Sequence, residues 1–148
     1  MEIAIDDKTS LQIRRVYKAP VAAVYAAWTD PEQMKHWMGP SDDFGESEVT
    51  MDVRVGGRYR IVMHSRDGEV HRVGGVFREV VTNRKLAYTW AWESTPERES
   101  LVTLEFKPSG EDTELVLAHQ RFADTQARDK HQQGWHGCLD RLGRFLAR

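Results

Sequence analysis

The sequence predicts a single α+β domain in which a curved antiparallel sheet of about seven strands surrounds a long C-terminal helix. Apolar residues alternate with a period of two through most of residues 48–121, which is typical of half-buried strands. Short turn signals separate these runs, so neighbouring strands are expected to pair antiparallel. From about Asp124 to near Ala147 the apolar period changes to 3.6, which indicates one long helix.

One strand and two short helices are expected at the start of the chain. Residues 11–18 alternate in polarity as a strand does. Apolar residues at helical spacing over residues 21–28 predict the first helix. The second helix is expected over residues 31–37, because Asp30 can cap it and Pro31 suits its first turn.

Six further strands are expected to form a meander. The dipeptide Asp67-Gly68 is a strong hairpin signal, and Pro108-Ser109-Gly110 predicts the last turn of the sheet. One face of such a sheet must be buried, and the only element long enough to cover it is the last helix. The six strands are expected over residues 48–53, 58–64, 69–80, 86–92, 101–106 and 113–121.

Length and composition indicate one folded domain over residues 1–148. The formal net charge of -2 gives no general electrostatic attraction to nucleic acid, so no nucleic-acid partner is predicted. No stretch approaches the ~20 apolar residues of a membrane span. A lone Cys138 cannot form an intramolecular disulfide, and residues 1–8 carry acids where an export signal would be basic. A cytoplasmic location is therefore expected.

The concave face of the sheet is expected to gather aromatic and aliphatic side chains. Such a face can line a pocket for a flat, apolar molecule, or it can form a plain packed core. Gly75 and Gly134 remove side chains from the facing surfaces, which favours a cavity. The candidate ligand-binding residues are Tyr59, Ile61, Met63, Val73, Phe77, Tyr88, Trp90, Trp92, Val102, Leu104, Leu117, His119, His131, Trp135 and Cys138.

His119 is a weak candidate for catalysis. It is in phase with Leu115 and Leu117 and should therefore face inward. There it could orient a ligand oxygen or act as a general base near pH 7. The favoured alternative is a core histidine that is hydrogen-bonded to the backbone or to the start of the last helix. Sequence alone places no serine, cysteine or carboxylate beside it, so no triad is predicted.

Other polar features have both a binding and a structural interpretation. Arg15 lies on the apolar face of the first strand, where it could bind an acidic group or form an ion pair at the sheet end. Cys138 lies on the apolar stripe of the last helix, which favours a small buried hydrophobe over a reactive thiol. No histidine pair shows ligand spacing such as His-x-x-x-His, so no metal and no other cofactor is predicted. Segments 38–47 and 94–100 could each be a mobile lid or a plain connector.

Several short segments together carry a family resemblance over nearly the whole chain. In order they are RVYKAP at 15–20, VYAAWTDPE at 24–32, WMGP at 37–40, DVRVGGRY at 52–59, DG at 67–68, GVFREV at 75–80, LAYT at 86–89, GW at 134–135 and LDRL at 139–142. Their order and spacing resemble the family related to the C-terminal domain of the activator of the heat-shock-protein-90 ATPase, within the START-like (SRPBCC) superfamily. The resemblance implies a helix-grip (START-like, Bet v 1-like) fold with a deep pocket between sheet and helix.

The resemblance leaves the function open, because this superfamily hosts lipid carriers, cyclases, hydroxylase subunits and self-resistance proteins on one scaffold. The first hypothesis is a non-catalytic binder of a small hydrophobic or aromatic molecule, acting as a carrier, sensor or sequestering protein. The second is a cyclase- or hydrolase-like enzyme with His119 or His131 as acid or base. The third is a chaperone-linked or other protein-interaction module with a filled core and an exposed apolar patch. A homodimer is compatible with each.

Overall fold

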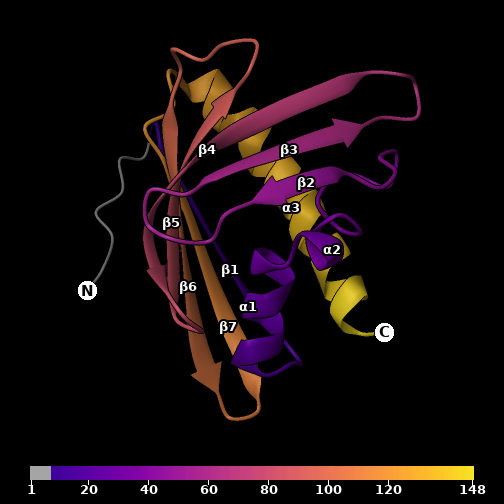
Figure 1. The fold of residues 1–148 in the computed structure, drawn as a ribbon, viewed down its shortest axis with the longest axis vertical. Helices are drawn as coiled ribbons and strands as arrows, with labels where there is room; N and C mark the ends of the chain where they lie inside the picture. The colour runs from indigo at the N-terminus through magenta and orange to yellow at the C-terminus, as the bar shows by residue number, and fades with distance from the viewer. Residues whose placement is uncertain (1–7) are drawn as a thin grey trace.

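The computed structural model describes residues 8–148, which form seven strands and three helices (Figure 1). The acidic N-terminal segment, on which the argument against an export signal depends, lies mostly outside the described residues. In chain order the elements are β1 (Leu11–Tyr17), α1 (Val21–Thr29), α2 (Pro31–Met34), β2 (Glu48–Met51), β3 (Arg58–His64), β4 (Val70–Val81), β5 (Lys85–Trp92), β6 (Ser100–Ser109), β7 (Asp112–Gln120) and α3 (Thr125–Leu146).

The strands form one antiparallel sheet in the order β1-β7-β6-β5-β4-β3-β2. In Figure 1 the strands β2, β3 and β4 cross the direction of β5, β6 and β7, so the sheet is strongly curved. The long helix α3 runs obliquely across this sheet, and α1 and α2 lie beside its C-terminal part. The predicted α+β class, with a curved sheet around a C-terminal helix, is confirmed.

The helix ends follow the capping residues. Asp124 accepts a hydrogen bond from the backbone N–H of Ala127 at 2.8 Å and begins the 22-residue helix α3, about 33 Å long. Asp30 accepts a bond from Glu32 N at 3.0 Å and begins α2, which ends at Met34, earlier than predicted. No helix formed by residues 8–148 is long and apolar enough to cross a membrane.

The turns agree with the sequence in one case and differ in another. Gly68 has φ 92° in the β3–β4 turn, as the Asp67-Gly68 signal predicts. The turn predicted over Pro108-Ser109-Gly110 begins later, because β6 continues to Ser109 and Pro108 pairs with Thr113 of β7, while Gly110 with φ 63° lies in the turn. The last residue of β6 that pairs with β5 is Glu105, so the missing N–H of Pro108 interrupts no bond on that side.

Gly75 lies where the backbones of β4 and β5 approach each other closely. The Thr89 side-chain oxygen accepts a hydrogen bond from Val76 N at 2.8 Å, and the Thr89 carbonyl accepts one from Tyr59 Oη at 2.6 Å. A Cβ on Gly75 would overlap that carbonyl oxygen and lie 2.6 Å from the carbonyl carbon. Gly75 therefore permits a close approach of two backbones, and the prediction that it opens a cavity is wrong.

Candidate functional site

An apolar pocket of about 310 Å³ lies between α3, strands β3 to β5 and the segment that follows α2. Ligand pockets span roughly 300–1,000 Å³, so this one suits a small molecule. Its walls include six of the predicted site residues, from strands β3 and β5 and from helix α3. The lining residues are Met38, Pro40, Phe44, Met63, His71, Trp90, Trp92, Lys130, His131, Gly134, Trp135 and Cys138.

The other predicted residues lie in the packed core outside this pocket. One group surrounds a gap of only about 10 Å³, no more than one water molecule needs. The gap is this small because Trp28 of α1 and Met34 of α2 fill that half of the concave face. That group is Tyr59, Ile61, Phe77 and Tyr88. A second group is fully buried and lines no part of the pocket, and it comprises Val73, Val102, Leu104, Leu117 and His119.

The segment between α2 and β2, expected to be either a lid or a connector, supplies a pocket wall whose residues were not named as candidates from the sequence. Met38, Pro40 and Phe44 of this segment all line the pocket. Phe44 forms an isolated bridge with Ser65, and its ring centroid lies 5.7 Å from that of His71 on β4. The only available signal was that Phe44 is the one large apolar residue in a polar stretch.

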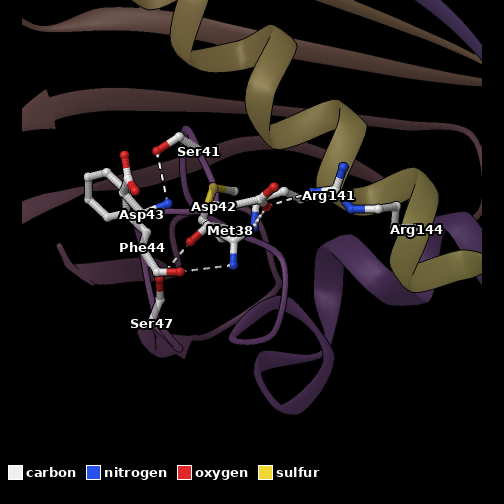
Figure 2. Close-up of polar contacts among 8 residues, drawn as sticks. All are labelled: Met38, Ser41, Asp42, Asp43, Phe44, Ser47, Arg141 and Arg144. Atoms are coloured by element: carbon white, nitrogen blue, oxygen red, sulfur yellow. Dashed lines mark hydrogen bonds and ion pairs between the residues drawn. The ribbon is translucent and has the colours of Figure 1, made fainter. Parts of the chain in front are cut away.

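Two arginines of α3 fix this segment against the helix. Arg144 Nη2 lies 2.6 Å from Asp42 Oδ1, and Arg141 Nε lies 3.8 Å from the same oxygen. Arg141 Nη2 also donates a hydrogen bond to the Phe44 carbonyl at 3.3 Å. Figure 2 shows both guanidinium groups reaching from α3 toward the segment. The pocket wall at Phe44 is therefore anchored to the helix that forms the opposite wall.

Two glycines of α3 face Pro40 but leave different amounts of space. A Cβ on Gly137 would overlap the Pro40 carbonyl oxygen and lie 2.7 Å from its carbonyl carbon. A Cβ on Gly134 would meet only Pro40 Cβ, at an ordinary 3.6 Å, and Gly134 lines the pocket. Gly137 thus allows close backbone packing, while Gly134 leaves room on the pocket side, as the sequence suggested.

His119 has a serine beside it, which sequence reasoning did not place there. Trp135 Nε1 donates to His119 Nδ1 at 2.9 Å, so the neutral ring carries its proton on Nε2. That nitrogen donates to Ser100 Oγ at 2.7 Å, and Ser100 donates to the Trp90 carbonyl at 3.1 Å. A base for serine would need a free lone pair on the facing nitrogen. The contacts therefore define a structural core histidine.

His131 forms a second imidazole–indole pair on the pocket wall. Trp92 Nε1 donates to His131 Nε2 at 2.9 Å, and His131 Nδ1 donates to the Ala127 carbonyl at 2.7 Å. Burial lowers the pKa of His131 and lowers that of His119 further below its ordinary value, with a smaller contribution from His131. Both rings are thus neutral at pH 7. Within residues 8–148, no group of three or more His, Cys, Asp or Glu is placed to hold a metal ion.

Arg15 and Cys138 both have structural surroundings. Arg15 Nη1 lies 2.7 Å from Asp140 Oδ1, and its Nη2 lies 3.0 Å from His136 Nδ1, so the ion-pair interpretation is confirmed. Cys138 is 5% exposed, and burial raises the pKa of its thiol to about 12. Its Sγ lies 4.0 Å from Met38 Sδ on the pocket wall. The thiol therefore acts as a small apolar group.

The curved sheet, the long C-terminal helix and the pocket between them define a helix-grip protein. The family described as "Activator of Hsp90 ATPase homolog 1-like protein" matches residues 18–147, and the chain belongs to this family. None of the curated proteins matches the chain.

Solved structures of similar proteins share the fold over almost the whole chain. An uncharacterised protein from Rhizobium leguminosarum is 30% identical, with a TM-score of 0.79 and 95% of each chain covered. The AHSA1 protein from Silicibacter pomeroyi is 25% identical, with a TM-score of 0.81, 93% of this chain and 97% of that chain covered. CalU16 from Micromonospora echinospora is 28% identical, with a TM-score of 0.70, 93% of this chain and 75% of that chain covered.

Proposed function

We propose that this protein binds a small, flat and largely apolar molecule in the pocket between the sheet and α3, as a carrier, sensor or sequestering protein. The observation that carries this proposal is the 310 Å³ pocket with walls of aromatic, methionine and aliphatic groups. An engineered apolar cavity of about 150 Å³ binds benzene, so this pocket has room for roughly two fused rings.

The polar atoms of the inner wall favour an apolar ligand. Trp92 and His131 satisfy each other, and the second nitrogen of His131 is bonded to the backbone of α3. Cys138 stays protonated, because burial raises the pKa of its thiol to about 12. Among the described residues that line the pocket, Trp90 Nε1 is the one buried side-chain nitrogen or oxygen without a hydrogen-bond partner. A ligand with several polar groups deep in the pocket would therefore lose hydration that few bonds replace, which is costly. The pocket therefore selects against polar groups at its base.

The same bonds argue against a catalytic use of the pocket. A general acid or base must offer a nitrogen that can reach the substrate. Both nitrogens of His131 and both nitrogens of His119 already have partners, and His119 does not line the pocket. Binding without chemistry accounts for this arrangement.

Native mass spectrometry with organic extraction of freshly purified protein tests the proposal, followed by calorimetric titration with the neutral two-ring probe 2-naphthamide. We expect a retained apolar molecule or a one-to-one complex with the probe. The variant Gly134→Leu adds a side chain whose Cβ makes only an ordinary contact with Pro40, and its branched end occupies part of the pocket. It should bind the probe at least about tenfold more weakly.

A matched variant controls for general effects of substitution. Gly45→Ala adds one methyl group in open space, and Gly45 does not line the pocket. Its affinity for 2-naphthamide should equal that of the unmodified protein. The proposal is overturned if no molecule is retained and the probe does not bind, or if Gly134→Leu binds the probe as well as Gly45→Ala does.

A further inference from the structure

The mouth of the pocket carries one fixed charge among the described residues that line it, namely Lys130. Lys130 lies one helical turn before Gly134, so both residues lie on the pocket side of α3. Its side chain is exposed, and no ion pair links it to another residue in the described range 8–148. The adjacent acid Asp129 is instead paired with Arg128 at 2.9 Å. An unneutralised ammonium group therefore stands at the entrance to an apolar cavity.

The other ionisable group at the rim already has a partner. His71 of β4 lines the pocket, and its Nε2 lies 3.3 Å from Glu69 Oε2. Its ring packs against those of Phe44 and Trp92, with centroids 5.7 and 6.3 Å away. Glu69 already contacts the ring nitrogen of His71 on the strand side of the mouth, so Lys130 is the group there that is left to bind a ligand.

A charged group on a ligand could be accommodated only at this mouth. Deeper in the pocket, His131 and Trp92 bind each other and Cys138 is a protonated thiol. The unpartnered N–H of Trp90 is neutral, so an ionic group there would be buried without a counter-charge. Such burial is too costly to occur in an apolar site. At the mouth, an anionic group would keep part of its hydration and reach the flexible ammonium group of Lys130.

We infer that the ligand is an amphipathic anion, with a flat apolar body of about two rings inside the pocket and one carboxylate or similar group at the mouth, bound by Lys130 Nζ. This inference rests on the proposed function and adds the polarity and orientation of the ligand. The 310 Å³ volume favours a free small acid over a membrane lipid with complete acyl chains.

The isosteric pair 2-naphthoate and 2-naphthamide tests the inference, because the two molecules share a shape and differ in charge at pH 7.5. In calorimetric titrations at low ionic strength, the carboxylate should bind about three- to tenfold more tightly than the amide, as a partly exposed charge-assisted contact allows. Added salt should reduce this preference. Lys130→Gln should remove it by weakening the carboxylate alone, while Lys130→Arg should retain it.

A remote lysine provides the control for net charge. Lys18 is exposed and does not line this pocket, so Lys18→Gln changes the net charge equally and should leave both affinities unchanged. Equal binding of the two naphthalene compounds by the unmodified protein would overturn the inference and leave the proposed function standing. The inference also fails if Lys18→Gln weakens carboxylate binding as much as Lys130→Gln does. If neither compound binds, the inference fails, and the pocket proposal fails with it when native mass spectrometry also finds no retained molecule.

Discussion

The same substitution at two glycines of α3 should change the stability in opposite directions. Gly134 and Gly137 lie less than one helical turn apart, and both face the segment that forms a pocket wall. Alanine at either position removes a glycine from a helix interior, which contributes about 0.5–1 kcal/mol to the stability of the folded state. The two positions differ only in what the new methyl group meets.

The expected magnitudes follow from the space at each position. At Gly134 the methyl group lies 3.6 Å from Pro40 Cβ, so Gly134→Ala should raise the free energy of unfolding by about 0.5–1 kcal/mol. At Gly137 the methyl group would overlap the Pro40 carbonyl, and Arg141 and Arg144 hold this segment against the helix. Overpacking of this kind costs about 1–3 kcal/mol, so Gly137→Ala should lower the free energy of unfolding by about 1–2 kcal/mol.

Urea unfolding followed by tryptophan fluorescence and circular dichroism measures both changes, provided that the m value is constant. In a domain of this size each kcal/mol corresponds to roughly 2–4 °C in Tm, so the variants should differ by several degrees. Gly45→Ala adds a methyl group to the same segment in open space and should stay within about 0.5 kcal/mol of the unmodified protein. Equal stabilisation by Gly134→Ala and Gly137→Ala would refute the close packing of Pro40 on α3.

Two further predictions concern the buried ionisable groups. Because burial lowers the folded-state pKa of His119 and His131 below the unfolded value of about 6.5, the unfolded chain binds protons that the folded chain does not. Stability should therefore fall as the pH drops from 6.5 to 5.5, by up to ~1.4 kcal/mol per histidine. In urea titrations, His131→Gln should reduce this pH dependence by less than half, because the pKa of His119 is lowered further, and an unchanged slope would contradict the assignment. Cys138, with its thiol pKa raised to about 12, should resist Ellman's reagent in the folded protein and react fully in urea, and rapid reaction without denaturant would show that the thiol is accessible.

Local patterns in the sequence determine most of the architecture. Strand β3 has the bounds predicted from its alternation, and Asp30, Asp124 and Gly68 act as the sequence indicates. These signals are readable because side-chain period, capping and turn geometry depend on residues that are close along the chain. A sheet with short turns and a single long helix then leaves few alternatives for what covers its concave face.

Contacts between distant segments decide which inward-facing residues line the pocket, and the alternation of apolar residues along the strands does not. The alternation predicts that Trp90 and Phe77 both face inward, but Trp90 lines the pocket and Phe77 lies in the packed core. Which half of the concave face stays open depends on where α1 and α2 place Trp28 and Met34, and no periodicity in the strands contains that information. The candidate site was therefore predicted too broadly from the sequence.

The chemical state of the polar residues also depended on tertiary structure. The sequence places His119 inside, but only the fold brings Trp135 and Ser100 to its two nitrogens and fixes its proton on Nε2. Similarly, the space at Gly134 and the filled position at Gly75 look alike in sequence and differ because of the backbone that faces each. By itself the sequence determined the order of elements and the buried faces, since these follow from neighbours along the chain. The tertiary structure decided the extent of the pocket and the bonding of its histidines, since both depend on groups that meet only when the sheet curves around α3.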